Sequence, residues 1–150
     1  MSKGSEPISF QLLSLDGGGV RGLFSAAVLA HLEEDLNIRV TDHFDLITGT
    51  STGGIIALGL AIGLRPKEIV DFYLKRSDVI FQRSWLKFPL AQFWHHLRGV
   101  KYDNSNLVAA LKEVFGDHLL GDCRQPVVVP AFNLSTDGVR LFKTPHHKRS

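Results

Sequence analysis

Two glycine-rich turns constrain the fold of this chain more than any other feature. The first is the run Asp16-Gly17-Gly18-Gly19-Val20-Arg21-Gly22, and the second is the run Gly49-Thr50-Ser51-Thr52-Gly53. Each turn follows a short apolar run that predicts a strand and precedes a longer segment that predicts a helix. Repetition of strand, turn and helix indicates a parallel α/β sheet with right-handed crossovers. Both turns then lie at the carboxyl ends of strands, where such sheets form their sites.

The remaining elements continue this pattern. Strands are predicted at 8–15, 44–48, 126–134 and 139–143, and helices at 23–36, at 52–64, from Pro66, and from the capping residues 103–105 to Phe115. The last two strands are joined by a turn at Asp137-Gly138, so they form an antiparallel hairpin. We therefore expect an α/β fold with a mainly parallel sheet.

Length and composition are those of an ordinary globular domain. The chain has 150 residues, of which 44% are hydrophobic and 21% charged, and its net charge of +2 is too small to indicate nucleic acid as a partner. The polar residues 1–7 are expected to be disordered and contain no apolar signal region. The apolar run 55–64 is too short to span a bilayer. A lone cysteine, Cys123, fits a reducing compartment, so a cytoplasmic location is expected.

Ser51 lies at the centre of the second turn, which has the form G-x-S-x-G. This is the pattern of a nucleophile elbow, which holds a serine hydroxyl at the tip of a tight strand-to-helix turn. Gly49 and Gly53 provide the space that such a turn needs, and the N-terminus of the following helix favours negative charge beside the serine. The alternative is a helix N-cap serine in a glycine-rich turn, because the pattern alone is common.

The first turn has two interpretations. Its backbone N–H groups are expected to point into one space and to stabilise the oxyanion that forms when a serine attacks an acyl group. The run Gly17-x-Gly19-x-x-Gly22 also satisfies the G-x-G-x-x-G pattern of a dinucleotide-binding loop, with Asp42 or Asp45 about 20 residues further on. Asp16 argues against that interpretation, because it puts a carboxylate beside the pyrophosphate site. A P-loop is excluded, since no Gly-Lys-Ser/Thr follows the glycines.

Together the two turns resemble the N-terminal half of a patatin-like phospholipase domain. The resemblance covers residues 12–81, with signature runs at 14–22 and 44–54, and continues in the strand at 127–134. It implies a three-layer α/β/α sandwich that hydrolyses the acyl esters of phospholipids or related lipids, as a phospholipase A does. The implied mechanism uses a serine–aspartate dyad without a metal or another cofactor.

The resemblance also assigns roles to the residues of both turns. Ser51 is the implied nucleophile. The oxyanion hole is assigned to the first turn, at Gly17, Gly18, Gly19, Arg21 and Gly22. Arg21 is implied to hold this loop or to bind phosphate. The elbow around the serine is assigned to Gly49, Thr50, Thr52 and Gly53.

The dyad aspartate has no clear counterpart among these residues. In the family it belongs to an Asp-Gly-Gly or Asp-Gly-Ala motif downstream of the hairpin, whereas this sequence ends at Ser150. Asp137 is first of all a hairpin-turn residue, and none of the seven histidines is well placed as a base. We therefore expect residues 8–150 to be a truncated domain that is nearly inert alone. Its uncovered sheet is expected to cause poor solubility or pairing with another chain, including homo-oligomers.

An aromatic-rich segment at 84–100 has no clear period. Its large side chains either form a lipid-facing lid with peripheral membrane contact or pack against the third helix; they are Trp85, Phe88, Phe93 and Trp94. Packing is favoured, because such aromatic residues dominate cores. Three functional hypotheses remain: a lipid acyl hydrolase domain, a dinucleotide-binding module, and an inactive fragment that acts as an interaction module.

Overall fold

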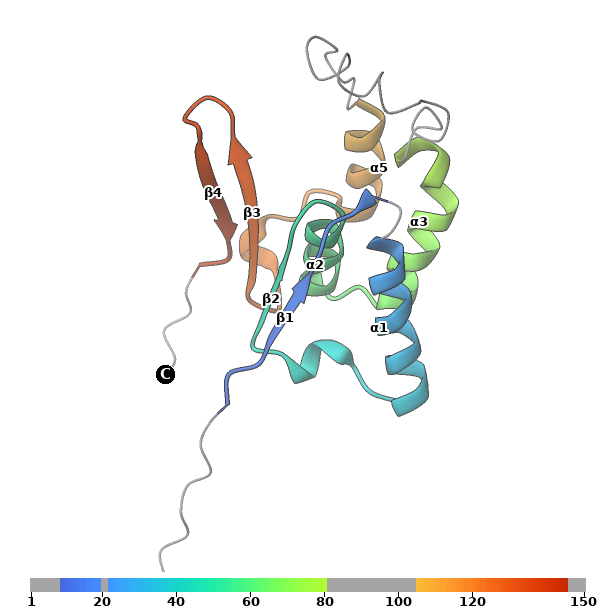
Figure 1. Ribbon diagram of the computed structural model, residues 1–150. Coiled ribbons are helices and arrows are strands. Elements are labelled where there is room, and N and C mark those ends of the chain that lie inside the picture. Colours follow the sequence, from blue (N-terminus) through green and yellow to red (C-terminus); the bar gives the residue numbers. More distant parts are fainter. Residues whose placement is uncertain (1–8, 20–21, 81–104, 146–150) are drawn as a thin grey trace, which may run out of the picture.

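The sheet of the computed structural model, which describes residues 9–19, 22–80 and 105–145, has four strands in the order β1-β2-β3-β4 (Figure 1). They are β1 (Leu12–Leu15), β2 (Leu46–Gly49), β3 (Val127–Asn133) and β4 (Gly138–Lys143). The first three strands run parallel, and β3 pairs with β4 in antiparallel fashion. The predicted α/β class with a mainly parallel sheet is confirmed, and the arrangement is consistent with a fragment of a patatin-like α/β/α sandwich.

The helices lie close to their predicted positions. They are α1 (Gly22–Leu36), α2 (Thr52–Ile62), α3 (Pro66–Ile80) and α5 (Ser105–Phe115), with short 3-10 helices η2 (Val40–His43) and η4 (Leu120–Asp122) that were not predicted. Helix α2 ends two residues before the predicted Leu64, because Gly63 adopts a left-handed conformation with φ 105°. The segments at 1–7 and 84–100 lie outside the described residues.

The strands are shorter at some ends than the apolar runs that predicted them. β1 begins at Leu12, where its pairing with Leu46 of β2 begins, although the apolar run starts earlier. The hairpin turn occupies residues 134–137, and Gly138 already belongs to β4, opposite Asn133. Apolar character alone does not define a strand end, because the end depends on where a partner strand stops.

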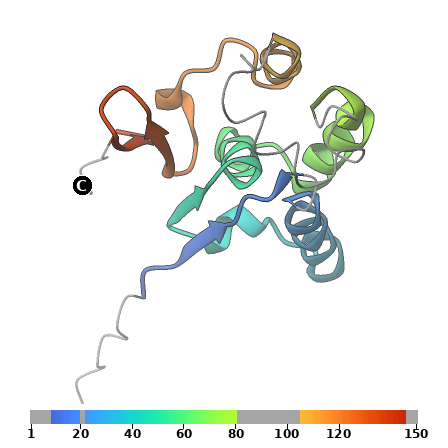
Figure 2. The same cartoon turned by 45° about the horizontal axis from the view of Figure 1, so that its top comes forward.

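Helix α2 forms the centre of the hydrophobic core. It contacts all three parallel strands and also α1 and α3. Its residues Ile56 and Leu60 are buried in one cluster with Ile47 of β2 and Val127 of β3. Figure 2 shows α2 against one face of the sheet, with α1 and α3 beside it. A helix that is apolar on most sides is expected in such a central place.

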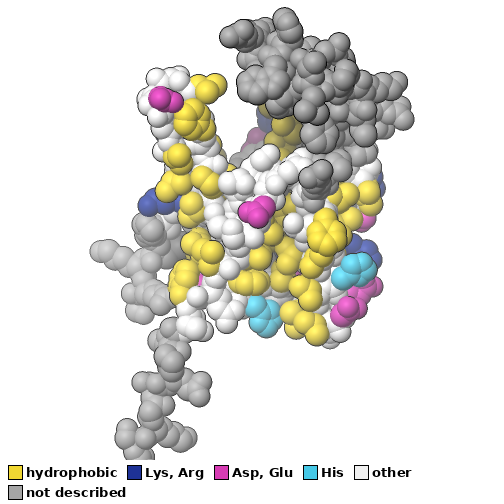
Figure 3. All heavy atoms as spheres, in the orientation of Figure 1, with side chains coloured by type: hydrophobic (Ala, Val, Ile, Leu, Met, Phe, Trp, Pro, Cys, Tyr) yellow, Lys and Arg dark blue, Asp and Glu magenta, His cyan; other side chains and the backbone are white. Residues whose placement is uncertain are grey.

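The other face of the sheet is open and apolar. Successive side chains of a strand point to opposite faces, so Leu12 lies on the face away from α2, where it is 49% exposed. The hairpin adds Phe132, Val139 and Leu141 to this face, each of them more than half exposed. Figure 3 shows apolar side chains on the hairpin and beside the strands. A greater share of the side chains on this face is apolar than is typical of a sheet face exposed to solvent.

A buried carboxylate ties α1 to the segments that follow it. The side chain of Glu33 is only 8% exposed, and it forms an ion pair with Arg65 at 3.2 Å. Its Oε1 atom also accepts a hydrogen bond of 2.9 Å from the backbone N–H of Val40. Glu33 therefore fixes the end of α1 against η2 and against the start of α3.

Candidate active site

The sheet register brings the two glycine turns together. Leu15 is the register partner of Gly49, so both turns leave the sheet at the same level. The N–H of Thr50 donates to the carbonyl of Leu15 at 3.2 Å, and the N–H of Gly17 donates to the Thr50 hydroxyl at 3.2 Å. A Cβ atom added to Gly17 would lie 2.8 Å from the Cβ atom of Ser51. The first turn thus packs directly against the serine.

Ser51 adopts a backbone conformation that is rare for a residue with a side chain. Its φ is 52° and its ψ is −123°, a combination that costs roughly 1–3 kcal/mol and persists only where the surrounding structure enforces it. Ser51 occupies the N-cap position of α2, but its side chain makes no capping hydrogen bond. The residue is exposed. A sharp, strained strand-to-helix turn with an exposed hydroxyl is the geometry that a nucleophile elbow needs.

Gly53 allows the start of α2 to approach the end of β1, and Gly49 allows the end of β2 to approach the start of α2. A Cβ atom at Gly53 would overlap the carbonyl of Leu15, which ends β1. One at Gly49 would overlap the carbonyl of Gly53 itself. Backbone atoms therefore fill the space that a side chain would occupy. These contacts agree with the prediction that Gly49 and Gly53 provide the space that a tight turn around Ser51 needs.

The starts of two helices converge behind the serine. A Cβ atom added to Gly22, the first residue of α1, would overlap the methyl group of Thr52, the first residue of α2. Helix N-termini carry partial positive charge, so both of them favour a negative charge that forms nearby. Gly22 and Thr52, assigned to different turns in the sequence, are therefore neighbours in space.

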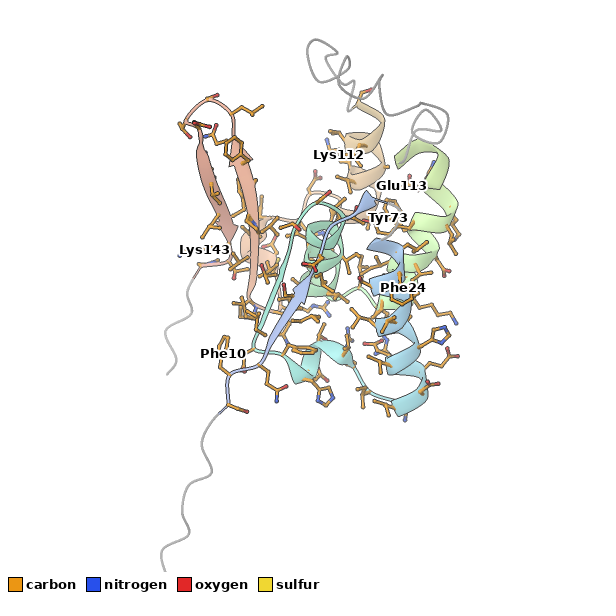
Figure 4. The ribbon with its side chains drawn as sticks, viewed as in Figure 1. Phe10, Phe24, Tyr73, Lys112, Glu113 and Lys143 are labelled. Carbon is orange, nitrogen blue, oxygen red and sulfur yellow. The ribbon has the colours of Figure 1, made fainter. Side chains whose placement is uncertain are left out.

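Tyr73 of α3 supports the first turn of α2 from inside the core (Figure 4). The residue is fully buried, and its hydroxyl donates to the carbonyl of Thr52 at 3.5 Å. Burial raises the pKa of Tyr73 well above its ordinary value, so the phenol keeps its proton at neutral pH. The helix predicted from Pro66 contains Tyr73, but only the structure shows the bond from its hydroxyl to the residue after Ser51.

The remaining members of the first turn are placed only in part. Gly18 is exposed, and Gly19 has a left-handed φ of 59°. Arg21 lies outside the described residues, so its implied role is untested. The hydroxyl of Thr50 is the acceptor for Gly17, a contact that sequence reasoning missed. The only hint of this bond in the sequence was that Thr50, a residue with a hydroxyl group, precedes the serine.

The residues weighed as bases from the sequence, Asp137 and the histidines, do not belong to the two glycine turns. Asp137 has a left-handed φ of 48° in the exposed hairpin turn. That turn begins six residues beyond Val128, the last residue of β3 that pairs with β2, a distance of roughly 20 Å along a strand. Among the described histidines, His43 lies in η2, which precedes β2, and His118 bonds the carbonyl of Phe115 through its Nδ1 atom. The expectation that Asp137 is a turn residue is confirmed.

Ser51 is exposed on the part of the surface that the structure describes. Two shallow hollows of the described surface are lined by residues of η2, of the end of α2 and of the segments before β1 and β3, and Ser51 lies in neither. Within the described ranges, no group of three histidine, cysteine or acidic side chains is arranged to hold a metal ion. In the same ranges, no helix has the length and apolar character needed to cross a bilayer.

Comparison with known proteins identifies the family. The model of the patatin-like phospholipase family matches residues 13–149. The chain belongs to the patatin-like phospholipase family. This agrees with the resemblance carried by the two glycine turns.

Curated patatin-like relatives occur in bacteria and plants. A protein of Pseudomonas aeruginosa named cGAMP-activated phospholipase is 42% identical over 139 residues, which are 93% of this chain and 41% of the relative. A Vibrio cholerae protein of the same name is 40% identical over 91% of this chain and 42% of the relative. Patatin-like protein 2 of Oryza sativa subsp. indica is 37% identical over 87% of this chain and 36% of the relative. The chain therefore spans about two fifths of the length of these patatin-like relatives.

Proposed function

We propose that this chain carries the nucleophile and the oxyanion-binding loop of a lipid acyl hydrolase, with Ser51 as the nucleophile. The observation that carries the proposal is the strained, exposed Ser51 packed against the Gly17 turn. Family membership supports a lipid ester, such as a phospholipid, as the substrate class. The tight packing of Gly17 on the serine also favours this function over a dinucleotide-binding loop, since the two turns form one unit.

The oxyanion hole is proposed to use the amides of Gly18 and Gly19. The amide of Gly17 already donates to Thr50, so Gly17 acts by holding the loop against the serine. The N–H of Thr52 is a further donor, because the residue after the nucleophile serves this role in other nucleophile elbows. The positive N-terminal end of α2 adds to the stabilisation of the oxyanion.

The base is proposed to be an aspartate from a segment that this sequence does not contain. The matched relatives are more than twice as long as the region they share with this chain, and among the described residues no acidic or histidine side chain forms a hydrogen bond with Ser51. In this proposal residues 8–150 are the N-terminal portion of the hydrolase domain. The sequence expectation that the chain alone is nearly inert follows from this arrangement.

The proposed reaction has two steps. The aspartate takes the Ser51 proton as Oγ attacks the ester carbonyl, and the oxyanion forms against the glycine-loop amides. The C–O bond to the alcohol breaks, the alcohol leaves with that proton, and an acyl-serine remains. Water then attacks the acyl-serine, gives a proton to the aspartate, and releases the fatty acid and the free Ser51 hydroxyl, which recovers the proton.

A cyclic dinucleotide is the activator to test first. Two of the bacterial relatives are named cGAMP-activated phospholipase. We extend this regulation to the protein that contains this chain only as part of the proposal, on the basis of that similarity. A hydrolysis assay of a polypeptide of the relatives' length, with and without cGAMP, tests it.

A fluorophosphonate probe tests the nucleophile. We expect weak labelling of Ser51, because the proposed base is absent from this chain. The labelling should be lost in Ser51→Ala and retained in Ser135→Ala, a control in the exposed hairpin turn. Equal labelling of the Ser51→Ala variant would contradict the assignment. If the 150-residue chain does not react, the same comparison is made in a polypeptide extended to the relatives' length. Absence of Ser51 labelling there would also contradict it.

A further inference from the structure

A hollow with two arginines lies at the end of α2 that is remote from Ser51. It has a volume of about 220 Å³, and its lining comes from the η2 region, the C-terminal end of α2 and the segment before β3. Ser51 is the N-cap of α2 and Gly63 is its C-cap, so the 11 residues of the helix separate the two places by roughly 16 Å. This hollow, here named the Arg39–Arg124 pocket, is therefore distinct from the proposed active site.

Both guanidinium groups of the pocket meet at one residue. The Nη2 atom of Arg39 donates to the carbonyl of Gly63 at 3.1 Å. The Nη1 atom of Arg124 lies 2.7 Å from the position that a Cβ atom on Gly63 would take. The positive side chains of Arg39 and Arg124, which are far apart in the sequence, therefore both lie against Gly63.

Neither guanidinium group forms an ion pair with a carboxylate of the described residues. The ion pairs found in the described ranges are Arg65–Glu33 and Arg76–Glu113, and no described carboxylate lies within 4.0 Å of Arg39 or Arg124. Asp42 lines the same pocket, but at a greater distance. The C-terminal end of α2 and Asp42 offset part of this positive charge. Two cations that converge on one residue still repel each other, and an anion between them reduces that repulsion.

The walls of the pocket are already fixed in the structure. The N–H of Arg124 donates to the carbonyl of Ala61 at 2.7 Å. The side-chain amide of Gln125 donates to the carbonyl of Thr41 at 3.2 Å. These bonds tie the segment before β3 to α2 and to η2. The backbone that carries Arg124 is therefore held in place before an anion binds, which lowers the entropic cost of binding.

We propose that the Arg39–Arg124 pocket binds a phosphate group. Guanidinium groups offer planar, paired N–H donors that match phosphate oxygens, and both arginines keep donors beyond the single bond to Gly63. The volume of about 220 Å³ is roughly seven times the ~30 Å³ share of one liquid water. This space is sufficient for a phosphate and part of the group to which it is esterified. The proposal does not depend on the role of Ser51.

Titration of the full chain with inorganic phosphate, followed by ¹H–¹⁵N NMR at constant ionic strength, tests the proposal. We expect saturable shifts at Gly63, Arg124 and Gln125, and none at Thr50 or Gly53. Arg124→Gln is expected to weaken binding by roughly tenfold or more, because it removes charge-assisted hydrogen bonds. Arg140→Gln makes the same charge change on the exposed β4 strand and should leave the affinity unchanged.

Arg39→Gln provides a second variant, which removes the charge of the other arginine, and its ¹H–¹⁵N spectrum away from the pocket shows whether the fold is kept. Shifts that do not saturate, or affinities that are the same in both pocket variants and in Arg140→Gln, would overturn the proposal. AMP and glycerol 3-phosphate are titrated in parallel. Tighter binding of AMP assigns the phosphate to a nucleotide, tighter binding of glycerol 3-phosphate assigns it to a lipid headgroup, and equal affinities assign it to free phosphate.

Discussion

The N–H of Gly17 donates a hydrogen bond to the hydroxyl of Thr50 at 3.2 Å and so joins the two glycine turns. The two residues are 33 positions apart in the chain, yet each stands beside a residue with a proposed catalytic role. Thr50 precedes Ser51, and Gly17 precedes the amides proposed for the oxyanion hole. This bond therefore sets the distance between the attacking hydroxyl and the groups that would stabilise its product.

Removing the Thr50 hydroxyl should loosen the first turn. Thr50→Val keeps the shape of the side chain but deprives the Gly17 amide of its acceptor. A hydrogen bond of this kind contributes about 0.5–1.5 kcal/mol, so amide hydrogen exchange at Gly17 should accelerate by up to roughly tenfold. Thr50→Ser retains the hydroxyl and should leave the exchange rate near that of the wild type. Equal exchange rates in all three proteins would show that the bond does not hold the turn.

A side chain at Gly53 should destabilise the fold. The Cβ atom in Gly53→Ala would overlap the backbone carbonyl of Leu15, which cannot move without disturbing β1. Overpacking of this kind costs about 1–3 kcal/mol. Gly121→Ala is the matched control, because a Cβ atom there would meet nothing within 4 Å. Urea unfolding measures both, and a Gly53→Ala midpoint close to that of the control would contradict the close approach.

Glu33 should matter for stability far more than its neighbour Glu34. Glu33→Ala removes the acceptor for the Val40 N–H and the partner of Arg65, and an unsatisfied buried donor costs about 1–3 kcal/mol. Glu34 is exposed, so Glu34→Ala should change the free energy of unfolding by no more than about 0.5 kcal/mol. Similar values for the two variants, measured by urea unfolding, would argue against the buried role of Glu33.

The raised pKa of Tyr73 predicts a loss of stability at alkaline pH. In the unfolded chain this phenol ionises near its ordinary pKa of 10.0, whereas burial keeps it protonated in the folded chain. Its contribution is fully present below pH 10 and decreases as the pH rises further, by up to about 1.4 kcal/mol per pH unit. Tyr73→Phe cannot ionise and should lack this part of the slope. Urea midpoints at pH 8, 10 and 11 for the two proteins measure the difference, and parallel slopes would refute it.

Local sequence patterns predicted most of the fold but few of the contacts between elements. The glycine turns and the apolar runs around them placed β1, β2 and α2, because turn chemistry and burial act within a few residues. Glu33 and Glu34 look alike in the sequence, and only the packing of α1 against α3 decides which of them is buried. The bond from Tyr73 to Thr52 joins residues 21 positions apart, and no local pattern encodes such a pairing.

For the candidate site, too, the local geometry was predictable from the sequence and the contacts between elements were not. The motif predicted that Ser51 occupies a tight turn, and its left-handed φ of 52° agrees with that prediction. The hydrogen bond from the Gly17 N–H to the Thr50 hydroxyl was not predictable. The G-x-S-x-G motif accepts a threonine at this position whether or not the bond forms. The convergence of Arg39 and Arg124 on Gly63 was equally hidden, since three segments that are distant in sequence create it.

Leu15 pairs with Gly49, so the proposed chemistry depends on the register between β1 and β2. A slip of one residue between β1 and β2 would displace the first turn by about 3.3 Å and turn Leu15 from the core to the open face. The apolar side chain of Leu15, which is 5% exposed, opposes that slip through its burial. A substitution that weakens this burial would therefore misalign the proposed active site from within the core, without changing any residue that touches the substrate.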